Sequence, residues 1–211
     1  SANGDKTYGG VMRISTKSKK LTLFPLANNT LEAQRLQQLI FEPLLKPAQN
    51  ERGWRYCLAS EVSLNAKRNQ VVIRLKKNIH FTDHSCYRFH SSELTAEDVA
   101  FSLSLACSQQ DNIQQELILP RLIVGGTKFF DKHQDPTKAS VKGIRVLDKH
   151  TLKIELTGAY NHFLSLLTSP SLSILSKQAA KFYGRLLYKN PVGTGPFLLQ
   201  NKLKNTYIFE R

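Results

Sequence analysis

The chain has 211 residues, which is enough for one large domain or two small ones with a real hydrophobic core. Its apolar content of 41% and charged content of 22% are typical of a globular protein, and no segment has the roughly 18 consecutive apolar residues of a transmembrane helix. The formal net charge is +14, but the basic residues are spread along the chain without a zinc-finger, RNA-recognition or basic-zipper pattern, so we expect no nucleic-acid partner.

The N-terminal part predicts a short strand followed by a helix. VMRIST follows two glycines and has the composition of a strand, and TLEAQRLQQLIFEPLL has the apolar spacing of a helix over residues 30–45. Asn29 and Glu32 can cap the start of this helix, and Pro43 indicates a disruption near its end.

The segment from Gln70 to Cys107 predicts a strand, a connection and a capped helix. Val71, Ile73 and Leu75 alternate with Val72 and Arg74, as in a strand with one buried face. Thr95 and Asp98 have the spacing of a capping box, and the helix that they begin should continue to Cys107.

The second half of the chain predicts further short elements. Residues 141–156 predict a hairpin whose turn is at 148–150. A short helix should end at Pro170, followed by a strand-like run over 171–175 and a helix that ends at Gly184. The last 22 residues contain a glycine turn and two strand-like runs, so the composition indicates an α/β or α+β fold.

The residues that could carry chemistry give no catalytic pattern. The sequence has no nucleophile elbow, no HExxH motif and no convincing pair of carboxylates. We therefore expect that the protein is not an enzyme and that it binds no cofactor. Gly193-Thr194-Gly195 lacks the Lys of a phosphate-binding loop and is interpreted as a glycine turn.

The only dense group of metal-ligand side chains is His84, Cys86 and His90, together with His80. Their spacing matches no standard zinc pattern, so we interpret the segment as a solvated loop and keep metal binding as the alternative. A disulfide between Cys86 and Cys107 is a further hypothesis, since it would attach this loop to the following helix.

Five segments, in order, resemble the bacterial extracellular solute-binding proteins of family 5, which include the oligopeptide-, dipeptide- and nickel-binding components of ABC importers. These segments are GGVMRIS, LTLFPLANNTLEAQRLQQLIFEPLL, VVIRLKKNIHFTD with ELTAEDVAFSL, VLDKHTLKIELTGAYNHFLSLLTSPSLSILSKQA and NPVGTGPFLLQNKLKNTYIFER. The chain departs from the family pattern at residues 83–92, where a tight Asp-Gly turn is replaced by a longer loop, and at Leu23-Phe24-Pro25, where an acidic residue is lost.

The resemblance implies an α/β fold: a periplasmic-binding-protein-like lobe (type II, cluster C) with an inserted α+β subdomain. It implies that residues 1–46 begin the N-terminal lobe, that 47–170 form the inserted subdomain, and that 171–211 return to the lobe. Since the family's chains are more than twice this length, we expect this chain to stop before the second lobe.

The resemblance also implies a function and a site. We expect a monomeric, exported receptor, either free in the periplasm or lipid-anchored in the cell envelope, that binds a small peptide or similar solute and delivers it to an ABC permease. The loop that enters the first long helix (Asn29, Thr30, Leu31, Glu32, Ala33) would pair with the ligand backbone as a strand does, although a simple helix cap is compatible with the same residues. The backbone of Gly193, Thr194 and Gly195 would face the ligand cleft.

Two alternatives remain from the sequence. Solute-binding domains of this type also occur in transcription regulators, so the chain could be a ligand-sensing domain. The other alternative is a metal or haem carrier that uses His84, Cys86 and His90.

Overall fold

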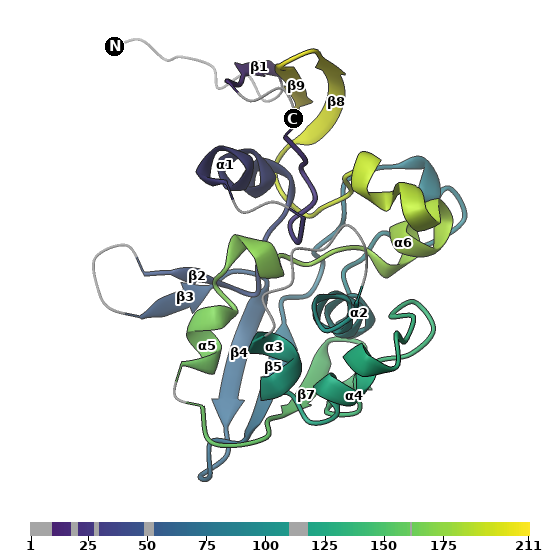
Figure 1. Ribbon diagram of the computed structural model, residues 1–211. Helices are drawn as coiled ribbons and strands as arrows, with labels where there is room; N and C mark the ends of the chain where they lie inside the picture. Colours follow the sequence, from purple (N-terminus) through teal and green to yellow (C-terminus); the bar gives the residue numbers. More distant parts are fainter. Residues whose placement is uncertain (1–9, 18–20, 28–29, 49–52, 110–117, 161) are drawn as a thin grey trace.

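The computed structural model describes residues 10–17, 21–27, 30–48, 53–109, 118–160 and 162–211 (Figure 1). Two groups of elements lie one above the other in Figure 1: a small sheet with helix α1, and a larger sheet with α2 beside it. Among the described residues, no helix is long and apolar enough to cross a membrane.

A three-stranded antiparallel sheet joins the two ends of the described chain. Its strands are β1 (Val11–Ser15), β8 (Leu198–Leu203) and β9 (Thr206–Glu210), in the order β1-β9-β8. β1 pairs with β9 so that Val11 lies opposite Glu210 and Ser15 opposite Thr206. The predictions of a first strand and of two C-terminal strands are therefore confirmed.

A four-stranded antiparallel sheet forms the base of the larger group. It has the order β4-β5-β7-β6, with strands β4 (Ala59–Leu64), β5 (Gln70–Leu75), β6 (Ile144–Asp148) and β7 (Thr151–Glu155). Val71, Ile73 and Leu75 are buried while Arg74 is exposed, as their alternation predicts. A separate hairpin joins β2 (Leu45–Pro47) to β3 (Trp54–Tyr56).

Short helices complete the two groups. The α-helices are α1 (Leu31–Ile40), α2 (Ala96–Ala106), α3 (Ile118–Leu122), α4 (Gly126–Asp131), α5 (Phe163–Leu166) and α6 (Lys177–Tyr183). The 3-10 segments are η1 (Ser85–Tyr87), η2 (Pro170–Leu172) and η3 (Gly184–Lys189). Gly184 ends α6 with a φ of 53°, which confirms the predicted cap.

Two sequence predictions of secondary structure are wrong. The first helix ends at Ile40 instead of near residue 45, because Phe41 is extended and the chain then enters β2. Residues 171–175 do not form a strand. They begin as the 3-10 segment η2, and then the Ile174 N–H donates to the Glu42 carbonyl at 2.9 Å, which is an isolated bond without a ladder around it.

Helix α2 lies between two hydrophobic cores and contributes to both. Phe101 and Leu105 pack in the core around α1 and the three-stranded sheet. The residues of α2 and its C-cap that pack in the core on the four-stranded sheet are Ala96, Val99, Ala100, Leu103 and Cys107. This helix is consequently buried over most of its circumference, and it holds the two groups of elements together.

The carboxylate of Asp98, on α2, is a buried acceptor for two helix starts. One oxygen accepts from both the backbone N–H and the hydroxyl of Thr95, each at 2.9 Å, and the other accepts from the backbone N–H of Lys177 at 2.9 Å. The first pair of bonds confirms the part of the capping box in which Asp98 reaches back to Thr95. The bond to Lys177 connects the starts of α2 and α6, which are 79 residues apart in sequence.

The hypothesis of a disulfide between Cys86 and Cys107 is wrong. Both cysteines and Cys57 are free thiols and are buried. Cys86 and Cys107 are part of the core on the four-stranded sheet, where each behaves as a small apolar side chain. Burial raises the pKa of the Cys107 thiol to about 12, so this thiol stays protonated at neutral pH.

We predict that Asp98→Asn lowers the free energy of unfolding by about 3 kcal/mol. The side-chain NH₂ group of Asn would replace one of the two carboxylate oxygens, so a donor would then face the backbone N–H of Thr95 or of Lys177. Urea unfolding would measure this loss. The matched control is Glu97→Gln, one residue earlier on α2, where the Glu97 side chain is 54% exposed and its ion pair with Lys177 at 2.7 Å reaches into solvent. The control should lose less than about 1 kcal/mol. Equal losses for the two variants would contradict this role for Asp98.

The hairpin turn between β6 and β7 is attached to the segment before α2 by Glu93. Its carboxylate lies 2.6 Å from the Lys149 ammonium and 2.8 Å from His150 Nε2. The hydrogen bonds from Lys149 and then from His150 lower the pKa of Glu93 to about 2, from 4.5. Because the folded-state pKa is depressed, the stabilisation is present above about pH 4.5 and is lost as the pH falls toward 2.

We therefore predict that Glu93→Gln reduces the pH dependence of stability in that range. The urea midpoint of the parent should fall more between pH 5 and pH 3 than the midpoint of the variant. Lys149→Met removes the larger of the two causes, so the folded-state pKa of Glu93 should rise toward 4.5 and the loss of stability in acid should be smaller than in the parent. If the parent and the Glu93→Gln variant lost stability in parallel, this assignment would be wrong.

Candidate functional site

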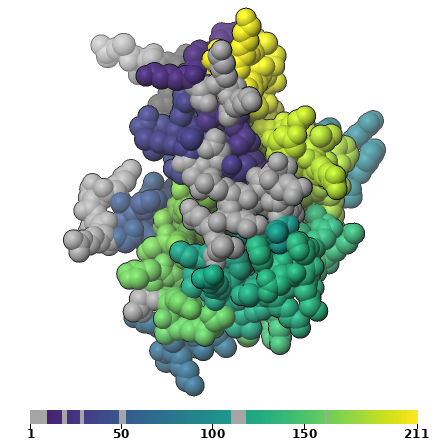
Figure 2. Space-filling model, in the orientation of Figure 1, coloured from purple at the N-terminus to yellow at the C-terminus, as the bar shows by residue number. Residues whose placement is uncertain are grey.

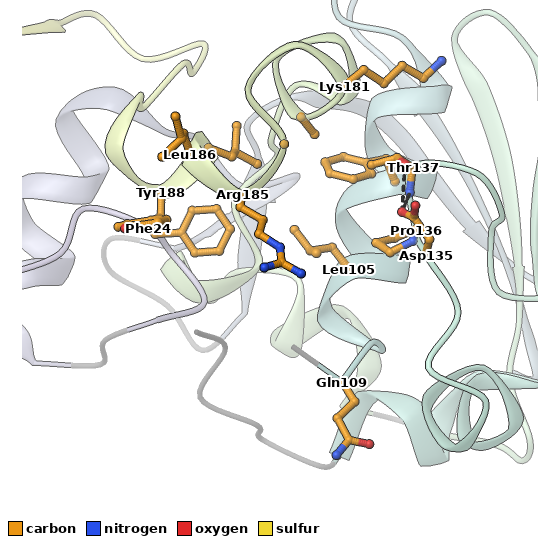
Figure 3. Close-up of a pocket in the computed structure, with 14 residues that line it drawn as sticks. Phe24, Leu105, Gln109, Asp135, Pro136, Thr137, Lys181, Arg185, Leu186 and Tyr188 are labelled. Atoms are coloured by element: carbon orange, nitrogen blue, oxygen red, sulfur yellow. Dashed lines mark hydrogen bonds between the residues drawn. The ribbon is translucent and has the colours of Figure 1, made fainter. Parts of the chain in front are cut away.

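A cavity of about 800 Å³ opens between the turn before α1, the end of α2, the loop at 135–137 and the α6–η3 segment (Figure 3). Small-molecule sites are usually concave pockets that combine apolar walls with polar groups, and the lining of this cavity contains both kinds of side chain. It is the candidate functional site. The residues that line it are Phe24, Phe101, Leu105, Gln109, Asp135, Pro136, Thr137, Ala180, Lys181, Gly184, Arg185, Leu186, Leu187 and Tyr188.

The apolar walls of the cavity belong to the core around α1. Phe24, Phe101 and Leu105 are buried in that core. The turn that carries Phe24 is held by Gln37 of α1, whose amide nitrogen donates to the Phe24 carbonyl at 3.1 Å. Since Gln37 is 1% exposed, this wall is fixed by a buried hydrogen bond.

The charged groups of the cavity differ in their environment. Asp135 is already occupied: its carboxylate accepts from the N–H of Thr137 at 2.9 Å and from the Thr137 hydroxyl at 2.7 Å, and Lys138 lies 3.5 Å away. Burial opposes its ionisation, but the hydrogen bonds from Thr137 outweigh burial and hold the pKa of Asp135 below its ordinary value. Within the described part of the chain, no side chain forms a hydrogen bond or ion pair with Arg185.

The predicted ligand loop at the start of α1 is partly exposed. Thr30, and not Asn29, is the N-cap, and its hydroxyl accepts from the Ala33 N–H at 3.2 Å. Glu32 does not reach back to a cap, because its carboxylate accepts from the backbone N–H of Lys17 at 3.0 Å. Leu31 is 65% exposed, whereas Ala33 is fully buried. Asn29 lies outside the described residues.

The glycine turn is packed on the C-terminal end of the same helix. The Gly195 N–H donates to the Ile40 carbonyl at 2.7 Å, and the Thr82 N–H donates to the Gly193 carbonyl at 2.9 Å. The Thr194 hydroxyl donates to the Glu42 carboxylate at 3.2 Å. A Cβ at Gly193 would lie 2.0 Å from the Ile40 carbonyl oxygen, so close backbone packing requires glycine there.

The structure does not bring the two predicted ligand segments to one point. The ten-residue helix α1 separates the Thr30–Ala33 segment from the Gly193–Gly195 turn. At 1.5 Å per residue, that is about 15 Å. The two segments can therefore contact one ligand only if the ligand is extended along the helix.

The loop that departs from the family pattern is attached to α6. The Tyr183 hydroxyl lies 2.8 Å from His84 Nδ1 and 3.0 Å from the Ser85 hydroxyl, and the Tyr87 hydroxyl donates to Ser176. Figure 2 shows this loop (blue) projecting at the edge of the molecule beside α6. Cys86 and Tyr87 of this loop are buried in the core on the four-stranded sheet.

The three side chains proposed as a metal alternative do not form a site. Cys86 is buried in the core, His84 is paired with Tyr183, and His90 is exposed. Across the described residues, no group of three His, Cys, Asp or Glu side chains could hold a metal ion. Burial lowers the pKa of His84, so its imidazole is neutral at pH 7 and suited to the hydrogen bond with Tyr183.

The sequence patterns do not predict the cavity or the position of Arg185 in its lining. The run KFYGRLLYK at 181–189 combines basic and aromatic residues and has no acid, which was an available signal for a binding surface. Nothing in the spacing indicates that this run faces Phe24 and Leu105, because the three segments are distant in sequence.

Comparison with protein families identifies the chain. A family model of bacterial extracellular solute-binding proteins, family 5 (middle part), matches residues 54–211. The chain therefore belongs to the family 5 extracellular solute-binding proteins. This confirms the resemblance seen in the sequence.

Curated relatives are named as binding proteins. The dipeptide-binding protein of Escherichia coli is 30% identical over 153 residues, which are 70% of this chain and 26% of that protein. The glutathione-binding protein GsiB of Salmonella typhi is 38% identical over 63 residues, which are 30% of this chain and 12% of that protein. The chain thus spans only a minor part of the length of these relatives.

Solved structures share the fold. An oligopeptide-binding protein of Borrelia burgdorferi superimposes with a TM-score of 0.74 at 21% identity, covering 89% of this chain and 36% of that chain. Listeria monocytogenes OppA bound to peptide gives a TM-score of 0.72 at 17% identity, covering 88% and 35%. The fold is accordingly the predicted α/β periplasmic-binding-protein type, and this chain corresponds to about a third of those proteins.

We predict that Gly195→Ala destabilises the protein by about 2–3 kcal/mol, because the new Cβ would lie 2.6 Å from the Ile40 carbonyl carbon and would disrupt the turn. Gly158→Ala is the matched control, since its Cβ would meet nothing closer than the Tyr160 ring at 3.7 Å. The control should change the unfolding free energy by less than about 1 kcal/mol. Urea unfolding of both variants tests the prediction, and a stable Gly195→Ala variant would refute it.

Proposed function

We propose that this chain is the N-terminal part of a receptor that binds a peptide and delivers it to an ABC permease. The observation that carries the proposal is the cavity of about 800 Å³ in a lobe whose fold matches peptide-binding proteins. Its lining combines apolar side chains, which suit the side chains of a peptide, with charged groups.

The start of α1 supports the same function. The N–H of Ala33 already donates to the Thr30 hydroxyl, whereas the N–H groups of Leu31 and Glu32, at the first two helical positions, have no acceptor within the helix and are available to a ligand carbonyl. Leu31 is exposed beside them. A peptide that paired with this backbone would be held largely independently of its side chains, which suits a receptor for varied peptides.

We also propose the division of the chain into lobe and insertion, at 1–46, 47–170 and 171–211. The pairing of β1 with β9 brings the first and last parts together, which supports this division. The four-stranded sheet is built from residues 59–155 alone, in agreement with an inserted unit. In this arrangement α2 is the part of the insertion that packs against the lobe.

The cellular setting follows from the family. Family 5 solute-binding proteins are periplasmic or extracellular, and we propose an exported, monomeric receptor, either free or lipid-anchored. The bound peptide would lie between this lobe and a second lobe that closes over it by a hinge motion.

We predict that native mass spectrometry of the protein, purified from the cells that produce it, will show a retained peptide mass. The mass should disappear when the protein is partly unfolded. A protein that is free of peptide in repeated preparations would argue against a peptide ligand.

A pair of variants locates the site in the same experiment. Tyr188 lines the cavity and is 37% exposed, so Tyr188→Ala should lower peptide occupancy several-fold by removing an apolar contact. Tyr56 on β3 is 41% exposed and does not line the cavity, so Tyr56→Ala should leave occupancy unchanged. Equal occupancy in both variants would place the ligand elsewhere.

A further inference from the structure

Arg185 enters the cavity as a cation between apolar walls. Gly184 has a φ of 53°, which turns the chain sharply between α6 and η3, and Arg185 follows immediately. In Figure 3 its guanidinium points between Phe24 and Tyr188 on one side and Leu105 on the other. Lys181, the other cation of the lining, points away from this position in the same view.

Among the residues that the structure describes, no acid pairs with Arg185. Asp135 is the acid in the cavity lining, and its oxygens are occupied by Thr137 and Lys138. The α6–η3 segment, residues 177–189, contains no Asp or Glu. Arg185 forms no ion pair with any described residue, although eight other ion pairs are found in that part of the chain. The whole chain has 30 Lys and Arg residues but only 16 Asp and Glu residues, so there are fewer acidic side chains than basic ones to pair with.

The chemistry of guanidinium limits what it can bind here. Arginine presents a planar pair of N–H donors that match a carboxylate in a bidentate arrangement. Arg185 is exposed at the edge of the cavity, so a ligand carboxylate can reach it from solvent while apolar walls lie beside it. The same walls offer contact to an apolar group attached to the carboxylate.

We propose that Arg185 recognises a carboxylate of the bound peptide, so that replacing this carboxylate by an amide weakens binding. This inference rests on the proposed function of the cavity as a peptide site. The carboxylate is either an acidic side chain or the C-terminus, and both have the chemistry that Arg185 binds. Phe24, Leu105 and Tyr188 contact the apolar part next to it.

The test compares peptides that differ only in a carboxylate. Isothermal titration calorimetry would measure the binding of Leu-Glu-Leu, of Leu-Gln-Leu and of the C-terminal amide of each peptide to the parent protein. We expect the loss of the recognised carboxylate to weaken binding about tenfold, as for one charge-assisted hydrogen-bonding pair. The pair of peptides that shows the loss identifies the source: the Glu-to-Gln pair indicates a side chain, and the acid-to-amide pair indicates the C-terminus.

Variants assign the preference to Arg185. Arg185→Ala should abolish the tenfold difference between the two peptides, and Arg185→Lys should restore part of it, because lysine keeps the charge and loses the bidentate geometry. Arg88→Ala is the control with the same change of charge: Arg88 lies over the Phe89 ring in the 84–92 loop and does not line the cavity. This control should keep the full preference.

The outcomes separate this inference from the proposed function. If neither the Glu-to-Gln pair nor the acid-to-amide pair differs in affinity, or if Arg185→Ala keeps the difference, Arg185 does not recognise a carboxylate and the peptide function is unaffected. If the parent binds none of the four peptides, both the peptide function and this inference are overturned. A preference lost in Arg88→Ala as well would show a general effect of net charge and would also overturn the role of Arg185.

Discussion

The burial of α2 between two cores is the constraint on which the other elements depend. Backbone N–H groups of the segments that pack against a buried helix are shielded from water, so they need hydrogen-bond acceptors on that helix. Its serines meet that requirement: Ser102 Oγ accepts from the Leu175 N–H at 2.8 Å, and Ser104 Oγ accepts from the Val141 N–H at 3.0 Å. Together with Asp98, they fix the chain segments that lie on either side of the helix. The segment that leads into α6, and with it one wall of the cavity, takes its position from these bonds.

The cavity results from the way in which the side chains of α2 are distributed between the two hydrophobic cores. Phe101 and Leu105 face the core around α1, and the C-terminal end of this face remains open between α6–η3 and the loop at 135–137. An apolar floor with a cation at its edge is thereby produced by packing, without a local motif. The Gly193–Gly195 turn and the Thr30 cap do not line the cavity. They form hydrogen bonds at the two ends of α1. The site thus combines a rigid floor with exposed groups at its edge, as suits a receptor for an extended ligand.

Local patterns predicted much of the fold correctly, and the failures have physical reasons. The strand at Gln70–Leu75, the hairpin with its turn before Thr151 and the start of α2 depend on neighbours in sequence, so alternation and capping were sufficient. The end of α1 depends on β2 pairing with a strand that comes later, and no helix signal contains that information. The run at 171–175 has the composition of a strand, but it lacks neighbouring strands, since its single bond to Glu42 joins it to an irregular segment.

By itself, the sequence determined the family and the type of fold, because five segments in the right order and with the right spacing are specific even when each one is weak. It also determined the capped start of α2, where Thr95 and Asp98 are three residues apart. Only the tertiary structure decided which residues line the cavity, since Phe24, Leu105 and Arg185 are distant in sequence and become neighbours through packing on the side of α2 that faces the core around α1. It also showed that Gly193 and Gly195 are glycines because the backbone of α1 lies against them, a close approach that no sequence pattern records.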